Sequence, residues 1–359
     1  MLNLIIVCGG RSPEHAVSLK SASSIVQHAD RKKYLLTLVH IDLQGKWSVL
    51  PVSADDSLQE IMGRLANLRH YSPLEALGHL PCNTLPTVVF PALHGPGGED
   101  GSLQGLFESL DIPYVGSNVS ASALGMDKVN MKRIAQALGM PVAPYLCLHY
   151  SEYAQAVPSL IRQVEELLRY PCFVKPARGG SSIGISRVGS LGELVPALEQ
   201  AFSYDQKIVI EREIVGREIE LALLGNAAVS CSQPGEFVRE PSFFDYQCKY
   251  LDKSLAMRIP AAVPARALRE MRQHAVTIYR EFDCSGLARV DFFLTAAGEV
   301  YFNEINTMPG FTVYSMYPSL WAADGMDCAE LIDRLINLAL ERQQAQLTAE
   351  QKARGVGND

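Results

Sequence analysis

Two apolar segments of the chain, Leu287-Ala288-Arg289-Val290-Asp291-Phe292-Phe293 and Tyr301-Phe302-Asn303-Glu304-Ile305-Asn306, carry polar side chains at alternate positions. Side chains alternate between the faces of a strand, so we expect Arg289 and Asp291 to share one face of the first strand. Glu304 and Asn306 should share one face of the second. Gathering these charges in a buried hairpin costs free energy unless something compensates them. A divalent cation on a phosphate would do so, because Mg²⁺ takes oxygen ligands from carboxylates and phosphates. The alternative is an ordinary hairpin with a surface ion pair.

This arrangement also predicts the register of the hairpin. Leu294 should lie opposite Glu299, because only an odd sum of paired residue numbers brings Asp291 and Glu304 to the same face.

Length and composition indicate a globular protein of two or three domains. The 359 residues are 48% hydrophobic, and the net charge of −7 argues against a general surface for nucleic acid or anionic membranes. The eight cysteines are scattered without a Cys-x-x-Cys pair, which is typical of free thiols in a reducing cytosol. The N-terminus lacks the features of a signal peptide, and no apolar run approaches the roughly 20 residues that span a bilayer. We therefore expect a cytoplasmic protein with no nucleic-acid or membrane partner.

The first part of the chain predicts an open, mostly parallel α/β sheet, because strands alternate with helices. The expected strands are 4–7, 34–41, 87–91 and 113–115. The expected helices are 12–29, with Ser12 as N-cap and Pro13 at N1, and 102–110. Residues 121–138 predict one further helix, with Gly139 at its C′ position.

Beyond residue 124 the pattern changes to α+β. Strands are expected at 142–148, 172–175, 183–188, 207–211 and 218–224, with a helix at 159–168. We divide the chain into an N-terminal α/β domain (1–124), a central α+β subdomain (125–214) and a C-terminal unit with the polar hairpin (215–342). Residues 343–359 are polar and lack periodicity, which predicts a flexible tail.

Residues 173–184 form a strand and a small-residue loop that could hold phosphate. Lys175 stands at the end of the strand, and the glycines after it allow backbone N–H groups to approach phosphate oxygens. Ser181 and Ser182 add hydroxyls. The spacing is not that of a P-loop, and the alternative is a flexible hairpin loop.

Two further segments could contribute to a nucleotide site. Residues 208–214 run from an apolar strand into charge, and with Glu218 they could supply an adenine slot and a carboxylate for ribose; the alternative is a strand end at the surface. Residues 243–250 hold four aromatic side chains and Lys249. They predict either a lid that excludes water and brings Lys249 to the phosphates, or a loop packed permanently on the core.

Other polar residues have competing explanations. Lys128 and Lys132 lie one turn apart on the expected helix, and we interpret Lys132 as a solvated surface lysine. Glu14 lies at a helix N-terminus, where the dipole stabilises it and where it could receive a substrate ammonium. His94, in a glycine-rich loop, is either a ligand contact or a satisfied polar group.

Together and in this order, the motifs resemble those of the D-alanine–D-alanine ligases of the ATP-grasp superfamily. The resemblance covers residues 2 to about 342 and includes Gly9–Ser18, His94–Gly105, Met126–Lys128, Phe173–Gly184, Gly216–Glu220, Asp245–Tyr250, Arg289–Asp291 and Asn303–Thr312. It implies a three-domain ATP-grasp ligase in which ATP phosphorylates the carboxylate of one D-alanine. The amine of a second D-alanine then attacks the acyl phosphate, giving D-alanyl-D-alanine for peptidoglycan. It also implies a homodimer.

The resemblance carries roles to individual residues. The ligands of two Mg²⁺ ions, with Mn²⁺ as an alternative, would be Asp291, Glu304 and Asn306. The ATP site would comprise Lys128, Lys175, Ser182, Glu211, Arg212, Ile214, Glu218, Lys249 and Phe293. The catalytic set would be Glu14, Ser181, Tyr250, Arg289 and Gly310, with Glu14, Ser181 and Tyr250 as a hydrogen-bonded triad and Arg289 with the Gly310 N–H as the oxyanion site. The D-alanines would be held by His94, Ser315 and Met316.

Some positions depart from the usual pattern of the family. Gly179 stands where many relatives have a larger polar or acidic residue, Ala16 where glutamate is frequent, and Arg212 where lysine is common. None of these differences removes a catalytic group. They concern the rigidity of the loop and the affinity for nucleotide, not the reaction. Tyr250 favours an amino acid as acceptor, D-alanine first, with D-serine or another small amino acid as the alternative. A non-catalytic nucleotide-binding module is disfavoured, because Lys175, Arg289, Asp291 and Glu304 are all present.

Overall fold

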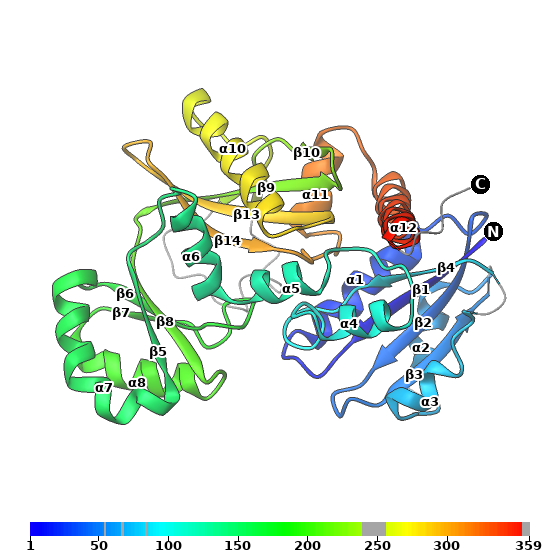
Figure 1. Cartoon of the computed structure of the whole chain (residues 1–359), viewed down its shortest axis with the longest axis horizontal. Coiled ribbons are helices and arrows are strands. Elements are labelled where there is room, and N and C mark those ends of the chain that lie inside the picture. The colour runs from blue at the N-terminus through cyan, green and yellow to red at the C-terminus, as the bar shows by residue number, and fades with distance from the viewer. Residues whose placement is uncertain (54, 66–67, 83–84, 239–255, 354–359) are drawn as a thin grey trace.

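The computed structural model describes residues 1–359 except 54, 66–67, 83–84, 239–255 and 354–359, and it contains three four-stranded sheets (Figure 1). The side chains of Ala154 and Ala156 are not described either. The predicted Lys249 and Tyr250 fall outside the described residues. None of the described helices is both long and apolar enough to cross a membrane.

The N-terminal sheet has the strand order β3-β2-β1-β4. Strands β1 (Leu2–Gly9), β2 (Tyr34–Ile41) and β4 (Thr87–Pro91) are parallel, which confirms the expected α/β sheet. The edge strand β3 (Trp47–Val52) is antiparallel and was not predicted. The strand expected at 113–115 is reduced to a single bridge between Tyr114 and Val89.

Helices cover both faces of this sheet. Helices α1 (His15–His28), α2 (Leu58–Leu65) and α12 (Cys328–Ala353) share one apolar core with it, and α3 (Pro73–Leu77) and α4 (Ser102–Ser109) share another. The predicted N-cap at Ser12 is wrong, because α1 begins at His15. The Ser12 hydroxyl is engaged in loop contacts: it donates to the His94 carbonyl at 2.6 Å and accepts from the Glu14 N–H at 3.2 Å.

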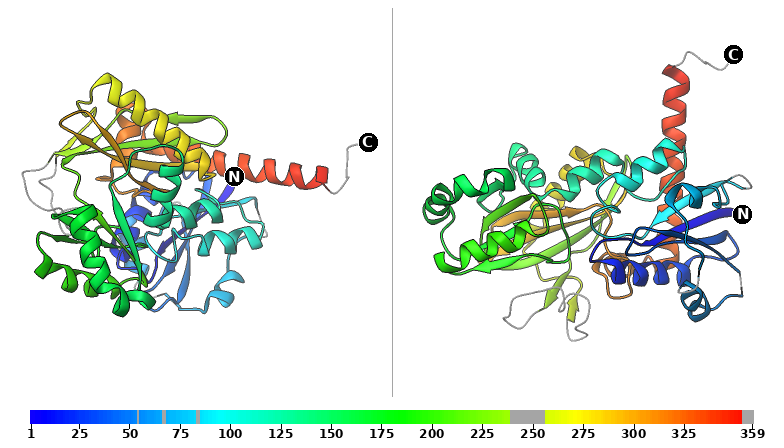
Figure 2. Two further views of the ribbon diagram at one scale, coloured as in Figure 1. Left: turned by 60° about the vertical axis from the view of Figure 1, so that its left-hand side comes forward. Right: turned by 90° about the horizontal axis from the view of Figure 1, so that it is seen from below.

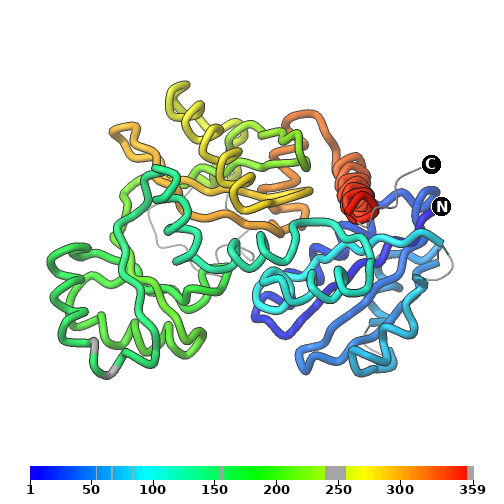
Figure 3. Tube along the Cα trace, in the orientation of Figure 1, coloured from blue at the N-terminus to red at the C-terminus, as the bar shows by residue number. Residues whose placement is uncertain are grey.

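The helix expected over 121–138 is two helices, α5 (Val119–Met126) and α6 (Lys128–Ala137). The single-helix prediction is wrong because Asp127 caps α6: its carboxylate accepts from the N–H groups of Val129 at 3.0 Å and Asn130 at 3.1 Å. Gly139 has φ +76° just beyond α6, as its predicted C′ position requires. The trace passes through these helices on its way from the N-terminal sheet to the second one (Figure 3).

The second sheet is antiparallel and has the order β5-β8-β6-β7. Its strands are β5 (Tyr145–His149), β6 (Cys172–Pro176), β7 (Ser186–Val188) and β8 (Lys207–Arg212). Helix α7 (Tyr150–Gln163), the π-helical turn Val164–Leu168 and α8 (Leu191–Phe202) pack on one face. The opposite face is therefore left for other contacts.

The third sheet is also antiparallel, in the order β10-β9-β13-β14. Its strands are β9 (Gly216–Gly225), β10 (Val229–Cys231), β13 (Gly286–Thr295) and β14 (Val300–Asn306), and a ribbon of β11 (Glu236–Val238) and β12 (Ala256–Arg258) lies beside it. Helix α10 (Ala265–Glu281) packs on one face with Phe292 and Phe302, and α11 (Met316–Ala323) packs near the other end of β9. Helix α12 continues to Ala353, so the residues predicted as a flexible tail from 343 are helical up to that residue; its last turns project from the body (Figure 2).

A β-bulge in β14 changes the register of the polar hairpin. Leu294 pairs with Val300, so the predicted pairing with Glu299 is wrong. The register then shifts between Phe292 and Asp291, so that Asp291 lies opposite Glu304, on the same face as predicted. The bulge inserts Asn303 as an extra residue, which is how proteins re-aim side chains beside functional sites. Asp291 and Glu304 therefore share a face as expected, but the bulge produces this arrangement and not the predicted register.

Candidate active site

A cavity of about 630 Å³ lies between the second and third sheets. The phosphate-type loop 179–182 and the ends of β8 and β9 border it. Every described residue predicted for the ATP site lines this cavity: Lys128, Lys175, Ser182, Glu211, Arg212, Ile214, Glu218 and Phe293. Ser181, Asn303 and Glu304 line it too. Segments far apart in the sequence thus converge on one hollow.

A buried carboxylate at the end of β8 is shared by two lysines. Glu211 contacts Lys175 through one oxygen, and its other oxygen lies 2.6 Å from Lys132 Nζ. Burial raises the pKa of Glu211, but Lys132 and Lys175 outweigh burial and lower it to about 2. The prediction of a solvated Lys132 is wrong: the residue is 2% exposed, and burial lowers the pKa of its ammonium.

Lys128 is the first residue of α6 and links the phosphate-type loop to the polar hairpin. Its ammonium donates to the Gly179 carbonyl at 2.6 Å and lies 3.5 Å from Glu304 Oε2. Its position follows from the break at Asp127, because the start of α6 is thereby set at the cavity wall. The same Asp127 carboxylate also forms an ion pair with Lys207 on β8.

The polar face of β13 carries the predicted arginine and aspartate in direct contact. Arg289 Nε and Nη2 donate to the two oxygens of Asp291 at 2.8 and 2.7 Å. Asn306 donates to Asp291 at 3.1 Å, and Glu220 on β9 lies 2.7 Å from Arg289 Nε. All of these groups belong to one face of the sheet, so the sequence-based expectation of a shared polar face is confirmed.

Carboxylates outnumber cations on this face. Burial raises the pKa of Asp291; Arg289 opposes the shift, whereas Glu304 and Glu218 add to it. The pKa of Arg289 is raised well above its usual value: burial acts against the charge, but Asp291 and Glu220 outweigh burial. In the described part of the chain, no three His, Cys, Asp or Glu side chains gather as a metal site. Two carboxylates and an amide nevertheless fit a hard cation that phosphate oxygens also ligate.

The loop between β6 and β7 joins the cavity to the N-terminal sheet. Ser181 donates a hydrogen bond to Glu14, which is 5% exposed and precedes α1. A Cβ on Gly180 would lie 3.0 Å from the Glu14 carboxylate, and one on Gly95 would lie 2.6 Å from it. Ser181 and Ser182 have φ of 53° and 59°, in the left-handed region that non-glycine residues seldom adopt. The loop therefore approaches Glu14 closely and holds its two serines in a strained conformation.

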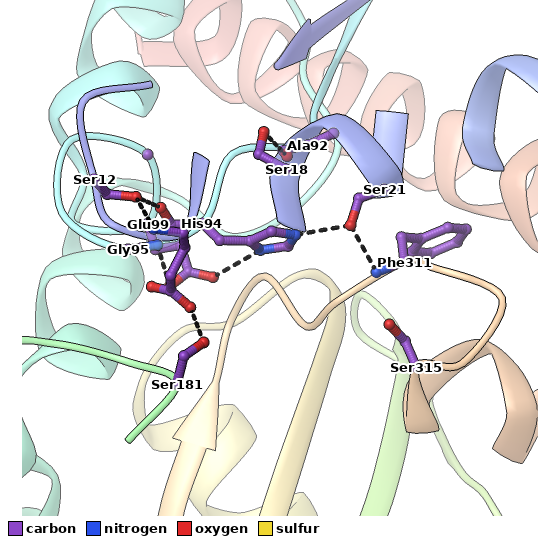
Figure 4. Close-up of polar contacts among 12 residues, drawn as sticks. Ser12, Ser18, Ser21, Ala92, His94, Gly95, Glu99, Ser181, Phe311 and Ser315 are labelled. Carbon is purple, nitrogen blue, oxygen red and sulfur yellow. Dashed lines mark hydrogen bonds and ion pairs between the residues drawn. The ribbon is translucent and has the colours of Figure 1, made fainter. Parts of the chain in front are cut away.

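His94 belongs to a hydrogen-bonded chain that reaches the segment after β14 (Figure 4). Its Nε2 lies 2.9 Å from Ser21 Oγ, which accepts from the Phe311 N–H at 3.2 Å. Its Nδ1 lies 3.5 Å from Glu99. Burial disfavours the charged imidazolium, but Glu99 and Glu14 outweigh this and raise the pKa of His94. Both ring nitrogens have a polar neighbour, which agrees with either interpretation of His94, a ligand contact or a satisfied polar group.

Gly310 and Ser315 lie together in the segment before α11. A Cβ on Gly310 would approach Ser315 Oγ to 2.8 Å, and that hydroxyl accepts from the Thr312 N–H at 3.0 Å. Met316, by contrast, is 2% exposed and its side chain belongs to the core. Any contact of Met316 with substrate would therefore fall to its main chain, at the N-terminus of α11, where helix N–H groups lack partners.

Sequence reasoning missed three residues of this region: Lys132, Glu220 and Asn303. The position of Lys132, one helical turn after Lys128, did not indicate that its side chain is buried. Glu220 stands in the same alternating strand as Glu218, and that alternation places both on one face. Asn303 donates to Glu218 at 3.1 Å, and as the extra residue of the bulge it lies outside the simple alternation of β14.

Comparisons with known proteins identify the family. Residues 3–117 match the model for the D-ala D-ala ligase N-terminus, and residues 134–337 match that for the C-terminus. The D-alanine–D-alanine ligase of Geobacillus kaustophilus is 43% identical over 356 residues, covering 96% of each chain. The chain belongs to the D-alanine–D-alanine ligase family. The resemblance inferred from the motifs is thereby confirmed.

Solved structures of the D-alanine–D-alanine ligase family share this fold. The Coxiella burnetii enzyme is 34% identical, with a TM-score of 0.82 and coverage of 99% of both chains. The VanG D-Ala:D-Ser ligase of Enterococcus faecalis is 32% identical, with a TM-score of 0.79, covering 94% of this chain and 99% of its own. The chain therefore has the expected ATP-grasp fold, and ATP with a divalent metal is the chemistry of its family.

Proposed function

We propose that this chain joins two D-alanines into D-alanyl-D-alanine, with hydrolysis of ATP to ADP and phosphate, for peptidoglycan precursors. The single observation that supports this most is the convergence of all eight described ATP-site candidates on one cavity beside the polar hairpin. The D-serine alternative is not favoured, because the curated relatives over nearly the whole chain are D-alanine–D-alanine ligases.

In the proposed site, Lys128 and Lys175 bind the phosphates of ATP, and the Ser182 hydroxyl and loop N–H groups add donors. Arg212, Ile214, Glu218 and Phe293 surround the nucleoside, with Glu211 at the end of the slot. Lys249 would join from the segment outside the described residues. Positioning and charge stabilisation supply most of the acceleration in phosphoryl transfer, which suits a site built from lysines and backbone donors.

Asp291, Glu304 and Asn306 would hold two Mg²⁺ ions, or Mn²⁺ in their place. The bound metal would neutralise phosphate charge and orient the phosphates. The donor set fits, because Asp291 lies opposite Glu304 and the charge of Glu304 raises the pKa of Asp291, so a cation near the pair would stabilise both carboxylates. Removal of divalent metal with a chelator should abolish turnover and leave the fold intact.

Glu14 would receive the ammonium of the first D-alanine, with His94 beside it. The carboxylate of that substrate attacks the terminal phosphorus, ADP leaves, and the amine of the second D-alanine then attacks the acyl carbon and displaces phosphate. Arg289 and the Gly310 N–H would face the oxygen that becomes negative. Ser315 and the main chain of Met316 would meet the carboxylate of the second D-alanine. Tyr250 would complete the triad with Glu14 and Ser181.

The remaining expectations are part of the proposal. We infer three units with the boundaries given above, a homodimer, and a cytoplasmic location, which the seven described free cysteines suit. Light scattering on the purified protein tests the dimer: a monomer mass at micromolar concentration would remove it.

The reaction is tested with purified protein, ATP and Mg²⁺. D-alanine alone, D-alanine with D-serine, and D-alanine with D-lactate are compared by phosphate release and by mass spectrometry of the product. We expect D-alanyl-D-alanine as the main product in the first two mixtures. Phosphate release without dependence on D-alanine, or a mixed dipeptide as main product, would overturn the proposed substrate. The Asp291→Asn variant serves as the inactive control.

A further inference from the structure

Glu220 is a buried carboxylate of β9 that belongs to none of the predicted roles. It is 4% exposed, and the strand register places it directly beside Asp291 on β13. Its Oε2 lies 2.7 Å from Arg289 Nε. Glu220 therefore contacts the guanidinium from β9, the strand on one side of β13, whereas Glu304 pairs with Asp291 from β14 on the other side, on the same face of the sheet.

Arg289 also occupies both carboxylate oxygens of Asp291, and Asn306 donates to one of them. A cation that binds Asp291 must compete with this guanidinium. A buried guanidinium that loses its anionic partner is strongly disfavoured, because its charge remains without compensation. When Asp291 binds a cation, another carboxylate has to form the ion pair with Arg289. Glu220 is already within ion-pair distance of the guanidinium.

We propose that Glu220 is a positioning residue: it holds Arg289 in place, so that Asp291 can bind the divalent cation while the guanidinium stays directed at the developing oxyanion. The inference rests on the roles proposed above for Arg289 and Asp291. Without the Glu220 charge, Asp291 is the remaining strong partner of Arg289 on β13, and binding of the cation and retention of the arginine become competing events.

The test compares Glu220→Gln and Glu220→Asp with wild type. Glu236→Gln is the matched control. Glu236 lies on β11, outside the cavity; it is also 4% exposed, and it pairs with Arg217 and Arg258. Mn²⁺ binding to the enzyme–ADP complex is measured by electron paramagnetic resonance of free Mn²⁺, and kcat and KM by phosphate release. Unfolding midpoints report on the fold of each variant.

We expect Glu220→Gln to weaken Mn²⁺ binding at least about fivefold and to lower kcat about 10- to 100-fold, the range seen when a residue that orients a metal ligand is removed. The KM for ATP should change less than about threefold, since the lysines that bind phosphate are untouched. Glu220→Asp should fall between Gln and wild type, and Glu236→Gln should match wild type in both readouts.

Unchanged Mn²⁺ affinity and kcat in Glu220→Gln would overturn the proposal. Equal losses in Glu220→Gln and Glu236→Gln would also overturn it, because they would indicate a general effect of removing a buried charge. If Glu220→Gln does not fold, Glu220→Asp decides, and values equal to wild type count against the proposal. Failure of the wild type to make D-alanyl-D-alanine would refute the proposed substrate, whereas the Mn²⁺ comparison would still test Glu220.

Discussion

Lys132 Nζ lies 2.6 Å from Glu211 Oε2, and only 2% of the lysine side chain and 4% of the glutamate side chain are exposed. Lys175 contacts the other oxygen of the same carboxylate. Because Lys132 remains beside Glu211, Lys175 can turn toward a phosphate without leaving a buried carboxylate unpaired. The pair would thus leave Lys175 available for the nucleotide phosphates in the proposed site.

Replacement of Lys132 by methionine should lower the stability of the protein. The variant keeps the aliphatic length but leaves Glu211 with a single partner, and we expect the free energy of unfolding to fall by about 2–4 kcal/mol. Chemical denaturation measures this. Lys33→Met is the control, because Lys33 pairs with Asp333 at the surface, and its unfolding midpoint should stay close to wild type. Equal midpoints for the two variants would show that the buried pair adds no stability.

The low pKa of Glu211 makes a prediction about acid stability. A carboxylate whose folded pKa is about 2, below its ordinary value of 4.5, stabilises the fold above the ordinary value, and this contribution disappears as pH falls toward 2. The stability difference between wild type and Glu211→Gln should therefore be largest at about pH 6 and smaller at about pH 3. Urea denaturation at several pH values measures it. A difference that stays constant with pH contradicts the assignment.

Replacement of Asp291 by asparagine should remove activity and spare the fold. The amide keeps the shape and can still accept from Arg289, but it lacks the charge that a divalent cation requires, so we expect turnover to fall about 10³-fold or more. Phosphate release measures turnover, and circular dichroism with thermal unfolding checks the fold. Unfolding of the variant where wild type stays folded would show that the carboxylate is structural.

Loss of the Ser181 hydroxyl should weaken the binding of D-alanine. Ser181→Ala removes the hydrogen bond to Glu14, worth about 1 kcal/mol, so the KM for D-alanine should rise about fivefold. The control is Ser109→Ala, which loses an exposed bond to the Gly105 carbonyl far from the cavity. Steady-state kinetics, with D-alanine varied at saturating ATP and ATP varied at saturating D-alanine, give the KM for each substrate in both variants. A rise confined to the KM for ATP would remove Ser181 from the D-alanine site.

The break between α5 and α6 can be tested at Asp127. Asp127→Ala loses the ion pair with Lys207 and two capping hydrogen bonds, of which the cap alone should cost about 1–2 kcal/mol, and it loosens the helix turn that carries Lys128, so the KM for ATP should rise. Ser72→Ala on α3 removes a comparable cap away from the cavity and should leave that KM unchanged. If both variants alter the KM for ATP equally, the cap does not act through Lys128.

The sequence predicted elements whose patterns are local. Strands β2 and β4 have the expected bounds, because an apolar run between turn residues determines a buried strand. The motif resemblance also predicted the eight described ATP-site candidates that line the cavity. The strand bounds and the individual motifs can both be predicted because each depends on a short stretch of neighbouring residues.

The errors arose where one side chain overrides a pattern or where burial is set by distant parts of the chain. Asp127 interrupts an otherwise continuous helical stripe, and the extra residue Asn303 shifts a register that alternation alone would fix. Lys132 is buried only because Glu211, 79 positions later in the sequence, lies against it. Periodicity cannot report such partnerships, because they are tertiary.

The left-handed backbone at Ser181 and Ser182 has a consequence for how the loop can vary. Each costs roughly 1 kcal/mol relative to glycine, so glycine at either position would relax the main chain. It would also delete a hydroxyl that faces the cavity or reaches Glu14. Substitution by glycine would thus relieve backbone strain at both positions but remove a hydroxyl of the proposed site. A screen that selects for thermal stability alone should therefore enrich glycine at these positions, and the enriched variants should be less active.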